Sequence, residues 1–218
     1  VRADAERRLS DAKVKAERIE VDESHERSRG SLSAQGGVGF GVLSSSEGES
    51  SGVLLGGQAA GHLGFWGTAP ADGMASGLEV RVMGRYLQLV GGTGAQRVAE
   101  GRATIRWFFG RVGVGAAGEV RLVDTTLTLN STPRSFTGFG VGPSLGIALV
   151  DTPSTRLIFN ASWMPIGSND LLRVVGDLDL HWKYFCLSLV GGTTTDPTAQ
   201  PVRVGFFLAV MAGVRFGW

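Results

Sequence analysis

The stretch that most constrains the fold is the final eighteen residues, 201–218. From Val202 to Trp218 every even-numbered residue is apolar, whereas the odd-numbered positions include two arginines and three glycines. Strict alternation predicts a β-strand, because successive side chains point to opposite faces of a sheet. Nine alternate apolar positions make a strand much longer than the usual five or six residues. The length suits a tilted strand that crosses a bilayer, which needs roughly nine to eleven residues.

The same stretch carries a resemblance to a known family. Its apolar positions Val210, Ala212, Val214 and Phe216 lead to an aromatic residue, Trp218. This pattern resembles the C-terminal signature of Gram-negative outer-membrane β-barrel proteins, whose last strand ends in Phe or Trp. The resemblance implies a small barrel over residues 35–218, placed in the lipid of the bacterial outer membrane by the barrel-assembly machinery. The alternative is a core strand of a soluble β-sandwich.

Composition narrows the possible classes. Hydrophobic residues make up 43% of the 218 residues, yet no run approaches the ~18 apolar residues of a membrane helix. A membrane protein of this kind must therefore be a closed barrel. The net charge of +1 gives no field that favours nucleic acid. One cysteine and three scattered histidines predict no disulfide, no metal site and no cofactor. Val1 opens a charged stretch that lacks the apolar region of a signal peptide. We expect that a signal peptide has been removed.

Residues 1–34 are predicted to form a charged amphipathic helix followed by a linker. An apolar stripe repeats at spacings of four and three residues, as in a coiled-coil seam; it consists of Ala5, Leu9, Ala12, Ala16 and Ile19. Three roles remain open for this segment: a solvated periplasmic tail, a plug of the barrel, or a docking helix for a periplasmic or envelope protein partner through residues 1–30.

Alternating segments recur along the rest of the chain and predict an all-β, antiparallel transmembrane barrel. The segments are 36–43, 52–66, 78–90, 102–109, 119–130, 136–150, 156–164, 171–190 and 201–218. Bacterial single-chain barrels normally have an even number of strands. We therefore expect eight strands, with ten as the alternative, both termini in the periplasm and an extracellular loop at 191–200.

The face opposite the apolar one is charged, and it should line the lumen. The predicted lumen network consists of Glu79, Arg81, Arg85, Arg102, Arg106, Asp177, Asp179, His181, Lys183, Arg203 and Arg215. In a barrel of about eight strands side chains just fill the interior, and buried charges are costly unless paired. A closed lumen held by ion pairs is the favoured interpretation. A narrow anion-preferring pore is the alternative, because seven of the predicted residues are Arg or Lys and three are Asp or Glu.

Catalysis is not expected. Asp177, Asp179 and His181 share one face, and an Asp–His pair could orient a general base. Ser188, however, is assigned to the opposite face from His181, and Cys186 to the lipid-facing side with Trp182. The tryptophans fit aromatic girdles at the bilayer interfaces. We expect a structural anchor or subunit of an envelope assembly. The alternatives are the channel and a barrel hydrolase that acts on lipid or surface peptides.

Overall fold

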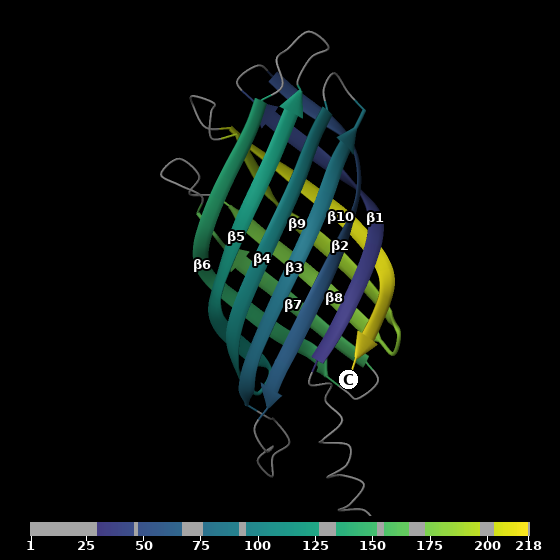
Figure 1. Ribbon diagram of the computed structural model, residues 1–218, viewed down its shortest axis with the longest axis vertical. Helices are drawn as coiled ribbons and strands as arrows, with labels where there is room; N and C mark the ends of the chain where they lie inside the picture. The colour runs from purple at the N-terminus through teal and green to yellow at the C-terminus, as the bar shows by residue number, and fades with distance from the viewer. Residues whose placement is uncertain are drawn as a thin grey trace, which may run out of the picture.

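The computed structural model describes residues 30–45, 48–66, 76–91, 95–126, 134–151, 155–165, 173–196 and 203–217. They form one closed barrel of ten antiparallel strands (Figure 1). The strands are β1 (Gly30–Ser45), β2 (Gly48–Trp66), β3 (Gly77–Val90), β4 (Ala95–Phe109), β5 (Val112–Thr126), β6 (Arg134–Asp151), β7 (Thr155–Trp163), β8 (Val174–Trp182), β9 (Phe185–Asp196) and β10 (Arg203–Gly217). β1 closes the barrel, since Val38 lies opposite both Leu55 of β2 and Val210 of β10.

The strand number corrects one expectation. Eight strands is wrong, and ten, the alternative, is observed. The segment 171–190, expected as one strand, contains all of β8, a two-residue turn at Lys183 and Tyr184, and the first half of β9. Lys183 adopts φ 51°, a left-handed conformation that is uncommon for a residue with a side chain. The turn contains no Gly, Pro, Asn or Asp, the residues by which turns are usually predicted from sequence.

The N-terminal helix predicted for residues 1–34 cannot be compared with the structure as a whole. Its apolar stripe, Ala5, Leu9, Ala12, Ala16 and Ile19, lies outside the described residues. Residues 30–34, expected as part of a linker, belong to β1. Among the described residues, none belongs to a helix with the length and hydropathy needed to cross a membrane.

The two ends of the barrel can be told apart by their connections. The end that we call proximal carries the Gly110–Arg111 and Lys183–Tyr184 turns and the finish of β10, and the opposite end is called distal. Every strand has between 9 and 19 residues, so even the shortest two, β7 and β8, reach the roughly nine residues that a tilted crossing requires.

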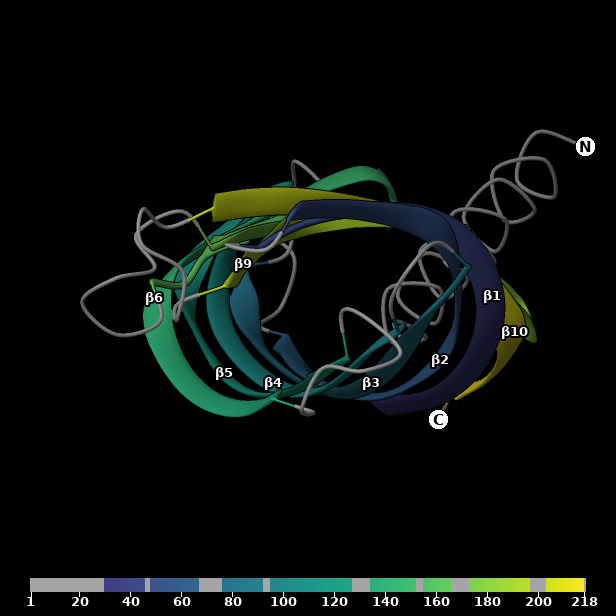
Figure 2. The ribbon, with the colours of Figure 1, turned by 90° about the horizontal axis from the view of Figure 1, so that it is seen from above.

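The barrel is oval in section, with β1 near one narrow end and β6 near the other (Figure 2). Strands β2–β5 form one long wall and β7–β10 form the facing wall. Inward-facing glycines mark the narrow ends. A Cβ on Gly142 of β6 would lie 1.8 Å from the Trp163 carbonyl oxygen, and one on Gly213, beside β1, would lie 1.9 Å from that of Ala34. Side chains at these positions would push neighbouring strands apart.

The distribution of polarity across the barrel wall is the reverse of that in a soluble protein, with apolar side chains outside and charged side chains inside. Outward-facing side chains such as Val38, Phe139 and Leu208 are about half exposed or more. Inward-facing charged side chains such as Glu119, Arg121 and Arg173 are each 1% exposed. The interior of the barrel is therefore the protein's core, and much of that core is ionic.

Candidate functional site: the charged lumen

The predicted lumen residues divide into four groups in the structure. Those that lie inside the barrel and form ion pairs within the lumen are Glu79, Arg81, Arg85, Arg102, Arg106, Asp177 and Asp179. His181 and Arg215 also face inward at the proximal end and are half-buried. Arg203 begins β10 opposite Asp196, and its side chain lies outside the described part. Lys183 is an error of assignment: it lies exposed in the β8–β9 turn.

The ion-pair layer nearest the distal end is centred on Arg173. This guanidinium donates to Glu100 at 2.7 Å and to Glu119 at 2.9 Å, and also to the carbonyl oxygen of Thr193. Glu100 accepts in addition from Arg85 at 2.8 Å, and Glu119 from Arg102 at 2.9 Å. Each carboxylate is therefore shared by two guanidiniums, the arrangement that best offsets the cost of burying charge.

Across the middle of the lumen, Arg81 of β3 reaches the opposite wall. Its guanidinium lies 2.8 Å from Asp179 and 3.1 Å from Asp177, both on β8. Asn160 of β7 donates to the same two carboxylates, at 2.6 Å to Asp177 and 3.2 Å to Asp179. Ser188 of β9 donates to Asp179 at 2.5 Å. Two carboxylates held side by side are thus surrounded by donors from three strands.

A girdle of amides continues this layer toward the closing strand. Gln35 of β1 donates to the Ser188 hydroxyl at 2.9 Å, and Gln58 of β2 donates to Gln35. Gln58 in turn accepts from Arg85 at 3.1 Å. Because the polar side chains of β1 and β2 are joined to those of β3 and β9, the hydrogen-bonded network extends around the lumen.

The proximal layer is centred on Glu79 of β3, which is 2% exposed. It accepts from Arg106 at 2.6 Å and from Arg156 of the facing wall at 3.1 Å, and it lies 3.1 Å from His62. Arg106 also donates to Asn160 at 2.5 Å. This layer ties β2, β3 and β4 to β7 on the opposite wall.

These layers close the lumen in its described part. The pairs formed by Arg81, Arg156 and Arg173 run from one long wall to the other. The carboxylates at their centres are no more than 5% exposed. One polar cavity beside Arg102, Ser144 and Asn160 has a volume of about 10 Å³, which is about the minimum for one water molecule. A continuous water-filled path would leave these charges exposed, and they are not.

Several lumen residues were missed by sequence reasoning. Glu100 lies between the predicted segments 78–90 and 102–109, and Glu119 and Arg121 lie in the segment 119–130, from which no lumen residue was predicted. Both stretches belong to strands that are longer than their alternation indicated. A usable signal was the spacing of Glu100, Arg102, Thr104 and Arg106, which places four polar side chains on one face of β4.

The β8–β9 turn also reverses two face assignments. Apolar residues occupy even positions in β8, as at Leu178 and Leu180, but odd positions in β9, as at Leu187 and Leu189. Ser188 therefore faces inward, and so does Cys186, which is 4% exposed and not lipid-facing. Ser188 contacts Asp179 and not His181, although all three share the inner face. No group of three or more metal-ligating side chains occurs among the described residues.

The distal part of the lumen is apolar. A cluster of buried side chains lines it: Leu54, Leu87, Leu89, Val98, Val123, Val190, Phe207, Ala209 and Met211. Between this cluster and the Arg173 layer lies a cavity of about 20 Å³, bordered by Leu54, Leu89, Phe207, Arg121 and Arg173 among others. The interior therefore changes from ionic to apolar along its length.

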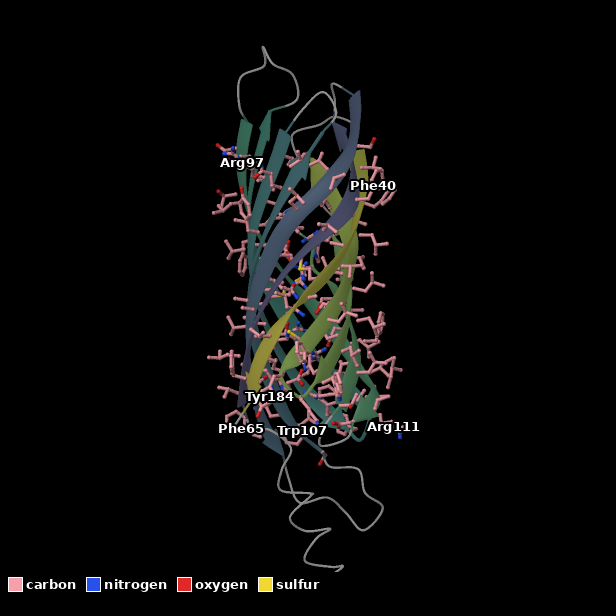
Figure 3. The ribbon with its side chains drawn as sticks, turned by 90° about the vertical axis from the view of Figure 1, so that its right-hand side faces the viewer. Phe40, Phe65, Arg97, Trp107, Arg111 and Tyr184 are labelled. Atoms are coloured by element: carbon pink, nitrogen blue, oxygen red, sulfur yellow. The ribbon has the colours of Figure 1, made fainter. Side chains whose placement is uncertain are left out.

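The outer surface carries aromatic side chains at both ends (Figure 3). Near the proximal end these are Phe65, Trp107, Phe109, Trp182, Tyr184, Phe185 and Phe216, all at least 47% exposed. Phe40 and the charged Arg97 lie toward the distal end, and Arg111 lies beside the proximal aromatic residues. Trp163 is also exposed, but it ends β7 away from the proximal turns. The side chains of Trp66 and Trp218 are outside the described part.

Comparison with known proteins supplies no relative: no family model matches the chain, and no curated protein matches it.

Proposed function

We propose that this protein is an integral β-barrel of the bacterial outer membrane, which serves as a structural anchor or subunit of an envelope assembly. The observation that carries the proposal is the inverted wall, apolar on the outside around the circumference and ion-paired on the inside. In water such a surface would be an aggregation liability, because soluble monomers rarely expose large contiguous apolar patches. In a bilayer the same surface is the expected one.

The dimensions and the aromatic residues support the same proposal. Strands of at least nine residues suffice to cross a bilayer. Trp107 and Tyr184 project outward near one end (Figure 3), and the exposed Trp182 ends β8 at the same end. Amphipathic rings there would sit at the level of lipid headgroups. The alternation that ends at Phe216 and Trp218 would be the signal read by the barrel-assembly machinery.

A structural role fits the closed lumen better than transport does. The ion pairs between Arg81 and Asp179 and between Arg173 and Glu100 span the section of the barrel, so ions could pass only if these contacts opened. A narrow anion channel is the second candidate, because arginines outnumber carboxylates among the described residues that face the lumen. We propose no catalytic role, since the inward Ser188 hydroxyl is bonded to a carboxylate and not to a histidine. Residues 1–30 would be the segment that binds an envelope partner.

The location is tested by expressing the chain with an export signal in a Gram-negative host. We expect it in the outer-membrane fraction, resistant to alkaline extraction, and shifting in apparent mass when heated in detergent. Quenching of tryptophan fluorescence by brominated lipids should also be strong, because Trp107 and Trp182 face outward. Recovery as a soluble periplasmic protein without quenching would overturn the proposal.

The role is tested by single-channel recording in planar bilayers, on the refolded chain and on a form that lacks residues 1–29. Silence from both forms is the expected result for an anchor. Steady anion-selective current from the full chain would replace the anchor with the channel. Current from the shortened form alone would assign the N-terminal segment a plugging role.

A further inference from the structure

The two aspartates in the middle of the lumen have fewer cationic partners than the buried glutamates around them. Each of the three buried glutamates contacts two guanidinium groups at 3.1 Å or less. Asp177 and Asp179, by contrast, share one guanidinium within that distance among the described residues. It belongs to Arg81 and lies 3.1 Å from Asp177 and 2.8 Å from Asp179. Arg102 is 3.9 Å from Asp177 and lies closer to Glu119, at 2.9 Å.

The two carboxyl groups also lie against each other. They belong to successive inward-facing residues of β8, and they are within hydrogen-bonding distance of each other. The same two nitrogen atoms, Nη1 of Arg81 and Nδ2 of Asn160, contact the Oδ2 atoms of both aspartates. Like charges in such a position disfavour each other's ionisation, and two carboxyl groups that meet in this way share one proton.

Titratable groups on the packed strands do not remove this imbalance. Those that face the lumen around the pair from β3, β4, β7, β8 and β9 are Glu79, Arg81, Arg85, Arg102, Arg106, Arg156, His181 and Cys186. Arg85, Arg102 and Arg106 each pair with a glutamate at 2.9 Å or less, and Arg156 pairs with one at 3.1 Å. Ser188 and Asn160 donate hydrogen bonds to the pair without bringing charge.

We propose that Asp177 and Asp179 form a proton-binding site, which holds one proton between the two carboxyl groups at neutral pH and makes the closed lumen sensitive to alkali. With that proton the pair carries a single negative charge, which the guanidinium of Arg81 balances. Arg81 reaches from β3 to β8, so the proton stabilises a contact that joins the two long walls. The site depends on contacts inside the barrel alone, whether or not the barrel anchors an envelope assembly.

The shared proton couples pH to stability with a definite sign. In the unfolded chain water solvates both side chains, and aspartates ionise well below neutral pH. The folded barrel therefore binds one proton more than the unfolded chain at neutral pH. Its stability should fall as the pH rises through the range in which the pair releases that proton.

Infrared spectroscopy on the refolded full chain in detergent micelles detects the proton directly, because a protonated carboxyl group has a C=O stretching band that a carboxylate lacks. We expect such a band at neutral pH, shifted when the aspartate carboxyl carbons are labelled with ¹³C, and lost at alkaline pH. The label separates the aspartates from the buried glutamates. A spectrum at neutral pH with no protonated aspartate band would overturn the proposal.

Matched variants place the proton. Asp177→Asn and Asp179→Asn each leave one carboxyl group beside Arg81, which then ionises, so both variants should lose the aspartate band. Asp124 is exposed on the outer face, and Asp124→Asn should retain the band. A band that persists in both inner variants would refute the assignment to the pair.

The pH dependence of unfolding is a second test, which a purely structural role of the pair would not affect. The midpoint of urea unfolding should fall between neutral and alkaline pH for the wild type and for Asp124→Asn. It should remain nearly constant for Asp179→Asn, because the amide replaces the protonated carboxyl group and cannot release a proton. An equal fall in Asp179→Asn and the wild type would contradict the proposal. If neither inner variant folds, the wild type decides, since loss of its aspartate band without a fall in the midpoint would refute the coupling.

Discussion

Glycines on the inner and outer faces of the barrel wall have very different surroundings. On the inner face a Cβ added to Gly213 would lie 1.9 Å from the Ala34 carbonyl oxygen, and one added to Gly37 would lie 2.0 Å from that of Val210. On the outer face an added Cβ at Gly84 or Gly101 would meet nothing within 4 Å. On the inner face, neighbouring strands of the closed barrel therefore restrict the size of the side chain. On the outer face, the surrounding medium sets which side chains are tolerated.

Charged residues show the same contrast. Inside, Glu119 is 1% exposed and is contacted by Arg102 and Arg173. Outside, Asp124 lies opposite Arg97 toward the distal end of the wall, and both are exposed. The inner charges act as core residues whose loss leaves a buried partner uncompensated. The outer charges lie where water or lipid headgroups can solvate them. Substitutions of one kind should therefore have effects that depend on the face.

The largest effect is expected from Glu119→Gln. The change leaves the buried guanidiniums of Arg102 and Arg173 without one of their carboxylates, and breaking a buried ion pair costs about 3–5 kcal/mol. The matched control is Asp124→Asn on the outer face, for which we expect a change within about 0.5 kcal/mol. Urea unfolding in lipid vesicles, followed by tryptophan fluorescence, measures both. Similar midpoints for the two variants would show that the inner network contributes little to stability.

The next effect concerns the outer face alone. Val210 is 49% exposed at the middle of β10, whereas its neighbour Met211 is fully buried. If Val210 faces the centre of a bilayer, Val210→Arg should cost about 2–4 kcal/mol, and Phe216→Arg near the proximal end about 0–1 kcal/mol. Refolding equilibria in vesicles measure the difference. An equal cost at both positions would contradict the placement of lipid around the barrel.

The sequence predicted the face of a residue correctly wherever the alternation of apolar and polar positions continued through its strand. Alternation alone placed Glu79, Arg81 and Asp177 on the polar face of their strands, because each strand keeps its period of two between turns. The prediction failed where a turn lacked turn residues. Lys183 and Tyr184 reverse the chain and shift the apolar positions from even to odd, which misplaced Cys186 and changed the strand count.

The pairing inside the lumen could not be predicted from sequence. Arg81 and Asp177 are 96 residues apart in the chain, and they meet because ten strands close with a particular register and an oval section. Neither the strand number nor the register is encoded locally. A one-strand error in the count places a different element opposite β3, and every cross-barrel pair changes with it.

The smallest effect returns to the glycines and sharpens the initial comparison. Gly213→Ala forces a methyl group against the backbone of β1, and overpacking of this kind typically costs about 1–3 kcal/mol. Gly84→Ala adds the same methyl group in open space, and it should be neutral or slightly stabilising because alanine loses less conformational entropy on folding than glycine. Unfolding midpoints in vesicles again provide the measurement. If Gly84→Ala destabilised the protein as much as Gly213→Ala, the outer glycines would be packed against something other than lipid, and the outer wall would have to be regarded as an interface.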